Sequence, residues 1–390
     1  MRKRRIFQAV FVLIIAALIL ISPAFCDDGD LIKQQLDMLD TDDMQSFIDQ
    51  INRETDGSIP LIDIKQTILG IFKGNPIVNI KNLLTGMGRY FIKEVILNFN
   101  LMGKIIVLAI FCAVLQNLHS AFEGDTVGKL AYNICYMLII IISIKSFYTA
   151  MKLGSDAIDT MVSFMQSLIP TLLALLVSVG GITSSTVFQP IVFGSISVIT
   201  TFIKVAIIPM IFLSAVLSIL NNLTEQVNVS RLAGLIRQTA VGLLGLILTI
   251  FLGIMSVQGV AASSLDSVTV KTAKFAVDNF IPIVGKFLTD ALDTVVSCSM
   301  LIKNGIGVVG LLVLVIICSV PLLKMFSIIV IYKLSSALIQ PILDNQIVQC
   351  LNDMSNSLLI LLASVIAVGV LFFIAITVIM GAGNMTVMMR

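Results

Sequence analysis

The stretch Thr160–Ile203, TMVSFMQSLIPTLLALLVSVGGITSSTVFQPIVFGSISVITTFI, contains no charged residue over 44 positions. A second charge-free stretch runs over 36 positions from Met354 to Met389. A helix that crosses a bilayer needs about 20 consecutive apolar residues. Only a bilayer, or the interior of a very large protein, accommodates stretches of this length without charge. The sequence therefore predicts an all-α polytopic membrane protein.

The overall composition agrees with a lipid environment and excludes several classes of function. Hydrophobic residues make up 57% of the chain and charged residues 12%, against about 25% charged in a typical soluble domain. The net charge of +2 gives no basis for a nucleic-acid partner. His119 is the only histidine and no two cysteines form a CxxC pair, so no metal or cofactor is predicted. We find no Walker A motif and no nucleophile–base pair, and we predict that the chain is not an enzyme.

The first 26 residues have the pattern of a signal peptide. Arg2–Arg5 form a basic segment, Ile6–Ile21 form an apolar core, and Ser22–Cys26 offer a small-x-small cleavage site. An uncleaved anchor is the alternative, because this core of 16 residues, interrupted only by Gln8, almost spans a bilayer.

Residues 27–100 are predicted to form an extracytoplasmic or interfacial region of amphipathic helices. Between residues 27 and 64 there are eleven Asp and Glu residues against only Lys33 and Arg53. Ile32, Leu36 and Leu39 follow helical spacing i, i+4, i+7. We expect this region to lie on the membrane or on the rest of the protein.

Residues 101–390 are predicted to form the polytopic domain, with about 7–8 transmembrane or re-entrant helices. The segment 187–220 is open to two interpretations, one tilted helix plus a re-entrant piece or two short helices. The distribution of lysine and arginine among the loops does not decide which side of the membrane each loop faces. The predicted spans are 105–118, 130–147, 161–180, 187–203, 205–220, 239–260, 307–331 and 358–380.

Proline positions suggest a threefold internal repeat of about 110 residues. Ile59-Pro60, Ile169-Pro170 and Ile281-Pro282 recur at offsets of 110 and 112, and Pro209 matches Pro321 at 112. Each unit would hold a Pro-broken segment followed by a helical hairpin with a polar tip. Broken helices at membrane depth occur only where they face protein or a water-filled cavity. The candidate kinks are Pro170, Pro209, Pro282 and Pro321, and chance pairing of abundant isoleucines with proline is the alternative.

Lys204 stands alone between two uncharged runs. A charge at the bilayer centre costs about 2.5–3.5 kcal/mol on insertion scales, so such a residue often marks a transport pathway. The alternative is that the long side chain reaches the interface, helped by a kink at Pro209.

The segment 261–305 is predicted to be amphipathic. Asp290, Asp293 and Ser297 share one helix face, and Lys286 is spaced to pair with Asp290. This face could line a polar cavity, lie on the membrane, bind a partner or simply be solvated. The candidate pathway or docking residues are Lys204, Lys286, Asp290 and Asp293.

Several runs of sequence resemble the stage III sporulation protein AE family of endospore-forming bacteria. The resemblance is most specific from FLGIMSVQG at 251–259 through NFIPIVGK at 279–286, and it extends to IYKL at 331–334. The signal peptide, acidic N-terminal stretch and polytopic body agree with it over nearly the full chain.

The resemblance implies a location in the mother-cell membrane around the engulfed forespore. It further implies partners, namely the other stage III sporulation membrane proteins of the operon and their cytoplasmic ATPase, beside the lipid bilayer; a homo-oligomer is also open. The expected function is a permease-like core subunit of a multiprotein channel or secretion-type complex. No catalytic residues follow from the resemblance.

The residues themselves are also compatible with two other functions. A stand-alone secondary transporter would use the repeat and Lys204 to frame a midplane site. A non-conducting membrane scaffold would need neither.

Overall fold

The chain is described by a computed structural model that covers residues 42–55, 63–72, 80–121, 126–223, 229–280, 285–343 and 345–388. The predicted signal peptide, residues 1–26, lies outside the described residues. Every element within these ranges is helical. In chain order they are α3 (Asp42–Glu54), α4 (Ile64–Phe72), α5 (Ile80–Ala121), α6 (Thr126–Ser178), α7 (Ile182–Phe202), the π-helical turn η1 (Ile203–Ile207), α8 (Ile208–Leu223), α9 (Ser230–Phe280), α10 (Gly285–Ile339) and α11 (Asn345–Met388).

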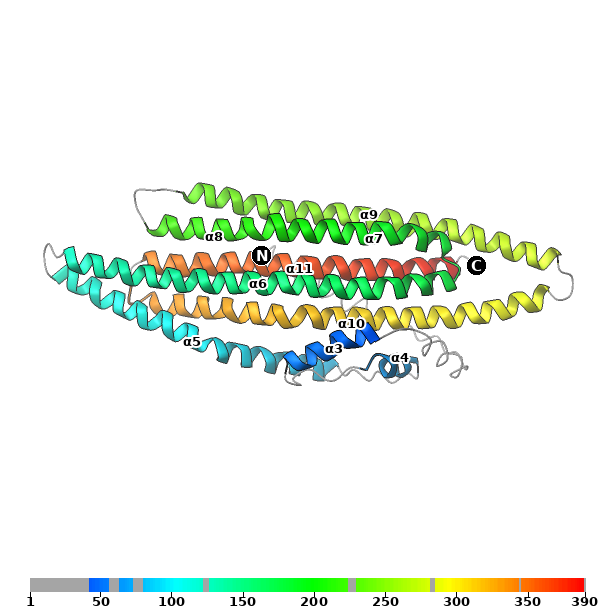
Figure 1. Ribbon diagram of the computed structural model, residues 1–390, viewed down its shortest axis with the longest axis horizontal. Coiled ribbons are helices and arrows are strands. Elements are labelled where there is room, and N and C mark those ends of the chain that lie inside the picture. The colour runs from blue at the N-terminus through cyan, green and yellow to red at the C-terminus, as the bar shows by residue number, and fades with distance from the viewer. Residues whose placement is uncertain are drawn as a thin grey trace.

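The long helices run side by side along one axis and form an elongated bundle (Figure 1). α10 and α11 form its centre, because 72% and 61% of their most apolar windows are buried, against 17% for α5 and 22% for α9. α11 packs against α10, α9, α6 and α8, while α10 also contacts α5 and α6. The core is thus built from the two helices that carry the highest hydropathy, and the less apolar helices surround them.

Six helical segments of the described part are long and apolar enough to cross a membrane, fewer than the seven or eight predicted. The predicted spans 130–147 and 161–180 lie on one continuous helix, α6. The predicted spans 187–203 and 205–220 follow each other through η1 in a continuous helical rod. The polar tips predicted at 122–127, 221–228 and 344–346 lie at the junctions of α5 with α6, α8 with α9 and α10 with α11, where residues 122–125, 224–228 and 344 are outside the described residues.

Proline does not break the helices that the sequence suggested it would. Pro170 lies inside α6 and Pro321 inside α10, and both helices continue through them. Pro209 lies in the first turn of α8, directly after η1. Pro282 lies outside the described residues. The prediction of Pro-broken helices is therefore wrong at Pro170 and Pro321, where the helix continues past the one missing N–H, and the threefold repeat stays a prediction.

The helices are longer than a bilayer is thick. At about 1.5 Å per residue, the 55 residues of α10 extend for about 80 Å. The hydrocarbon core of a bilayer is about 30 Å thick. Part of each long helix must consequently lie outside the hydrocarbon core. The polarity of the exposed side chains indicates which part.

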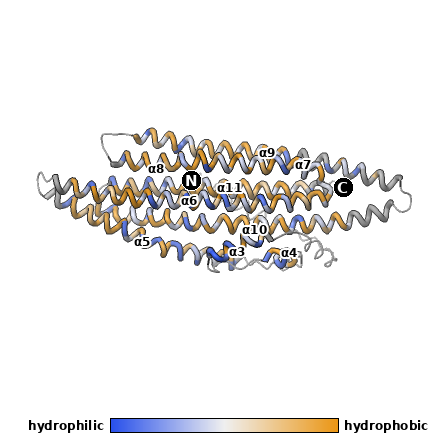
Figure 2. The backbone as a smooth tube through the Cα atoms, viewed as in Figure 1, coloured by the Kyte–Doolittle hydropathy of each residue, from blue (hydrophilic) through white to orange (hydrophobic). Residues whose placement is uncertain are grey.

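The N-terminal elements pack on the side of the bundle. Ile48 and Ile51 of α3 are buried, and the ring of Phe47 meets Phe164 of α6 edge-on at 5.7 Å. Colouring by hydropathy shows α3 and the start of α5 as markedly more hydrophilic than α10 and α11 (Figure 2). The apolar face of α3 thus packs on the bundle, while the predicted amphipathic residues Ile32, Leu36 and Leu39 lie outside the described residues. α5 runs unbroken through the predicted boundary at residue 100.

Candidate functional site

A tight turn folds the charge-free stretch 160–203 in half. α6 ends at Ser178, and Gly180 follows with φ at 93°, a left-handed conformation that glycine adopts at low cost. The Gly180 N–H donates to Val177 O at 2.8 Å and the Gly181 N–H donates to Leu176 O at 2.9 Å. This pair of bonds is a Schellman motif, which closes a helix end. α7 then returns antiparallel to α6, so the two ends of the stretch meet.

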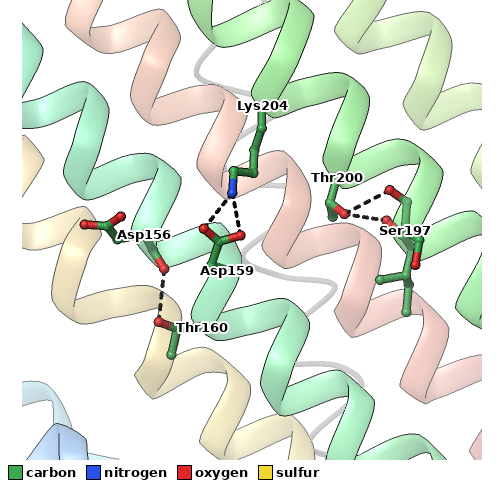
Figure 3. Close-up of polar contacts among 7 residues, drawn as sticks. Asp156, Asp159, Thr160, Ser197, Thr200 and Lys204 are labelled. Carbon is green, nitrogen blue, oxygen red and sulfur yellow. Dashed lines mark hydrogen bonds and ion pairs between the residues drawn. The ribbon is translucent and has the colours of Figure 1, made fainter.

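The two residues that border the charge-free stretch form an ion pair. Lys204 Nζ lies 2.5 Å from Asp159 Oδ1 and 2.6 Å from Oδ2, and both contacts bridge η1 and α6 (Figure 3). The Asp159 side chain is 57% exposed and the Lys204 side chain 29% exposed. In water such a pair contributes about 0–1 kcal/mol. The pair therefore neutralises both charges at the open end of the hairpin and contributes little to stability.

The backbone at Lys204 is irregular. Residues 203–207 form a π-helical turn, and the Ile208 N–H donates to Ile203 O, five residues back. Pro209 follows and has no N–H to donate, so the ordinary i→i−4 ladder is incomplete here. A π turn widens the helix locally and is frequent at functional sites. Lys204 thus occupies the one π turn in the described part of the chain.

Polar side chains line the exposed face of α6 on both sides of Asp159. They follow steps of four and three residues, so they share one face. No bulky apolar side chain is exposed on α6 between Tyr148 and Val177, whereas Met137, Leu138 and Ile141 are exposed nearer its start. The exposed polar members are Lys152, Asp156, Asp159, Ser163 and Gln166.

The neighbouring edge of α7 has the same character. Ser197 and Thr201 are exposed at helical spacing from Lys204, and Pro190 and Gly194 lie on the same face. Val198 and Val205, which point further round the helix, are 69% and 72% exposed. These side chains together form a surface that we name the α6–α7 polar face. Its nine residues are Lys152, Asp156, Asp159, Ser163, Gln166, Thr186, Ser197, Thr201 and Lys204.

The α6–α7 polar face presents hydrogen-bonding groups to the outside of the bundle. Thr160 and Thr200 direct their hydroxyls to backbone carbonyls of their own helices (Figure 3). No side-chain hydrogen bond involves Ser163, Gln166, Ser197 or Thr201 in the described ranges, so these groups face outward with unused hydrogen-bonding capacity. Groups of three His, Cys, Asp or Glu residues able to hold a metal are absent from the described residues.

A buried carboxylate holds the start of α7 to α9. Asp266, 1% exposed, accepts the Thr183 N–H at 2.7 Å and the Ser184 N–H at 2.9 Å. The first N–H groups of a helix have no intrahelical partner, and the helix dipole favours a negative charge there. Asp266 therefore fixes the α6–α7 hairpin against the rest of the bundle.

A buried lysine lies between the two central helices. Lys303 of α10 is fully buried and its Nζ donates to Met380 O of α11 at 2.8 Å. No carboxylate contacts it among the described residues. Gly307, one turn on, lies so close to α11 that an added Cβ would clash with the Met380 side chain. The sequence pattern grouped Lys303 with the amphipathic segment, whereas the structure places its side chain in the core.

The other predicted site residues do not join the α6–α7 polar face. Lys286, Asp290 and Asp293 lie in the first turns of α10, and their side chains are outside the described residues. The segment 261–305 forms the end of α9 and the start of α10, which extend beyond α7 and α11 in Figure 1. The sequence pattern singled out Lys204 but not its partner. The available signal was symmetry, because Asp159 and Lys204 flank the charge-free stretch and Gly180-Gly181 lies at its middle.

Comparison with known proteins places the chain in a family. The family model described as stage III sporulation protein AE matches residues 62–383. A protein of Bacillus subtilis (strain 168) named stage III sporulation protein AE is 41% identical over 352 residues, which cover 90% of this chain and 88% of that protein. No solved structure matches the chain. By both the family match and this identity, the chain belongs to the stage III sporulation protein AE family.

Proposed function

We propose that the protein is a membrane-embedded core subunit of a multiprotein transenvelope channel or secretion-type complex required for endospore development. In this proposal it acts in the mother-cell membrane around the forespore, beside other stage III sporulation membrane proteins and their cytoplasmic ATPase. It has no catalytic role of its own. The observation that carries the proposal is the outward-facing α6–α7 polar face on two helices whose apolar segments are long enough to span a bilayer.

The direction in which the polar groups point favours a subunit over a stand-alone transporter. A secondary transporter binds its solute between its own helices near the midplane. Here the centre of the bundle is occupied by apolar side chains of α10 and α11, including Ile317, Leu361 and Val368. Lys303 and several serines of α10 and α11 are buried there as well, whereas the α6–α7 polar face places its hydrogen-bonding groups on the outside of the bundle. Polar groups in that position are stabilised when protein or water, rather than lipid, covers them, and a conduit would run between subunits.

A test replaces the small polar residues of this face by bulky apolar ones. We expect the triple variant Ser163→Leu, Ser197→Leu, Thr201→Leu to insert and fold, since these side chains are exposed and make no side-chain hydrogen bonds within the described ranges. It should nevertheless lose copurification with the other stage III membrane proteins and fail to restore spores in a strain lacking the protein. Val198→Leu is the matched control on the same helix, since it changes an exposed apolar residue. Normal spore counts and normal copurification of the triple variant would contradict the proposal.

The projecting α9–α10 hairpin provides a second test of the same proposal. Its acidic residues Asp290 and Asp293 are proposed to dock a partner of the complex. Reversing both charges with Asp290→Lys and Asp293→Lys should weaken complex assembly and lower spore formation. Lys271→Glu, on the α9 arm of the hairpin, is the control for a general effect of charge. Unchanged assembly and sporulation in the double variant would remove the docking role from this hairpin.

A further inference from the structure

Two oppositely charged residues on the α6–α7 polar face have no partner within the described part of their own chain. Lys152 and Asp156 are exposed on α6, one helical turn apart. Asp159, a turn further on, is bound to Lys204. Neither Lys152 nor Asp156 forms an ion pair or a side-chain hydrogen bond with any described residue. The face therefore presents one free positive and one free negative charge beside a neutralised pair.

The arrangement of these charges is complementary to itself. Copies inserted in the same direction in one membrane associate about an axis along the membrane normal, so α6 of one copy would run parallel to α6 of the next. A two-fold interface places the same patch of both subunits in contact. Lys152 of each copy then lies level with Lys152 of the other, and Asp156 is displaced by about 6 Å along the helix. A lysine side chain reaches across that offset, and two reciprocal Lys152–Asp156 pairs form.

The rest of the face suits close contact between identical helices. Ser163 and Thr201 both donate and accept hydrogen bonds, so a row of such residues pairs with an identical row. Small exposed residues, among them Ala174 and Gly194, leave room for backbones to approach. Val198 and Val205 lie to one side of this strip and are free to contact lipid. The other exposed bulky side chains of the rod formed by α7, η1 and α8 are Ile182, Phe202, Leu213 and Leu220.

We propose that the α6–α7 polar face is the interface of a parallel homodimer, joined by reciprocal ion pairs between Lys152 of one copy and Asp156 of the other. The inference rests on the proposed function in one respect, that protein rather than lipid covers this face, and it names a second copy of the chain as the occupant. Burial of each pair between two subunits lowers the local dielectric and so strengthens it.

A charge swap tests the pairing directly. The full chain is purified into lipid nanodiscs, and its oligomeric state is measured by native mass spectrometry. We expect the wild type to be dimeric and K152D to be monomeric, because the introduced carboxylate at position 152 would then face Asp156 of the other copy. The double variant K152D/D156K should restore the dimer, since each pair re-forms with its charges exchanged. Lys333→Asp, on α10, is the control and should leave the dimer unchanged.

Cross-linking gives a readout that does not depend on the charges. In a chain whose native cysteines are replaced by serine, Ser163→Cys should form a disulfide-linked dimer in isolated membranes, and Leu246→Cys on α9 should not. Thermal unfolding of each variant verifies that it is folded, and D156K serves if K152D is not. A K152D variant that is folded and as dimeric as the wild type, or a failure of S163C to cross-link, overturns the inference. That result leaves the proposed function standing, which fails separately through the triple leucine variant.

Discussion

Single buried polar residues in this bundle have opposite consequences for stability. Asp266 meets two backbone N–H groups that no other group of the described chain satisfies. Asp266→Asn should lower the free energy of unfolding by about 1–3 kcal/mol, because one N–H would face an amide donor and lose its acceptor. Thermal or denaturant unfolding of the protein in detergent measures this change. Lys271→Gln, exposed on the same helix, should have no effect, and equal stability of both variants would show that the cap is dispensable.

Replacement of the buried Lys303 is expected to have the opposite effect on stability. Its ammonium is buried between α10 and α11 without a carboxylate contact in the described chain, where it donates to Met380 O. Lys303→Met keeps the length of the side chain and removes the cost of burying a charge, so stability should stay equal or rise by about 1–3 kcal/mol. The same unfolding assay tests it, with Lys333→Met on the exposed side of α10 as control. A marked loss of stability in Lys303→Met alone would mean that the lysine contributes to packing or pairing.

Among the elements, the α6–α7 hairpin decides where the polar residues lie. Gly180 takes φ at 93° and closes α6, while Asp266 anchors the first turn of α7. Gly180→Ala should cost roughly 1–2 kcal/mol, since a Cβ in the left-handed region is strained. Gly242→Ala is the matched control, because a Cβ added at Gly242 within α9 would meet no other group and alanine favours a helix. A Gly180→Ala variant as stable as the wild type would show that the turn relaxes to another geometry.

The α6–α7 hairpin also shows which features of the helices could be predicted from the sequence. Apolar length identified α6 and α7 as helices, and the spacing of Lys204 marked it as unusual. Continuity through Pro170 and Pro321 was missed, because a proline costs one hydrogen bond but a long packed helix retains all its other contacts. The amphipathic spacing of Ile32, Leu36 and Leu39 lies outside the described residues and stays a prediction, and periodicity does not specify that Phe47 of α3 packs on Phe164.

Over the whole molecule, the exposed surface changes character along the bundle. α6 exposes Met137 and Ile141 near its start and Ser163 and Gln166 further along. The arms of α9 and α10 beyond the bundle carry many charges in sequence. The two ends of the molecule therefore suit different surroundings, lipid for the start of α6 and water for the α9–α10 hairpin.

Cysteine accessibility in intact membranes checks this polarity. In a chain without native cysteines, Ile141→Cys should react poorly with a membrane-impermeant maleimide, because lipid would cover it. Lys271→Cys, exposed on α9, should react readily once the side of the membrane that it faces is open to the reagent. Detergent solubilisation should equalise the two rates. Fast labelling of Ile141→Cys before solubilisation would place the start of α6 in water.

Composition and charge spacing by themselves determine that this protein is helical and adapted to lipid, because a 44-residue run without charge has no stable place in water. Local patterns also reveal the positions of the hairpin tips and the isolation of Lys204. Tertiary structure alone decides that Asp159 neutralises Lys204, that Asp266 caps α7 and that Lys303 is buried against Met380. The physical reason is that these contacts join residues from 45 to 83 positions apart, and which helix faces meet depends on the packing of the whole bundle.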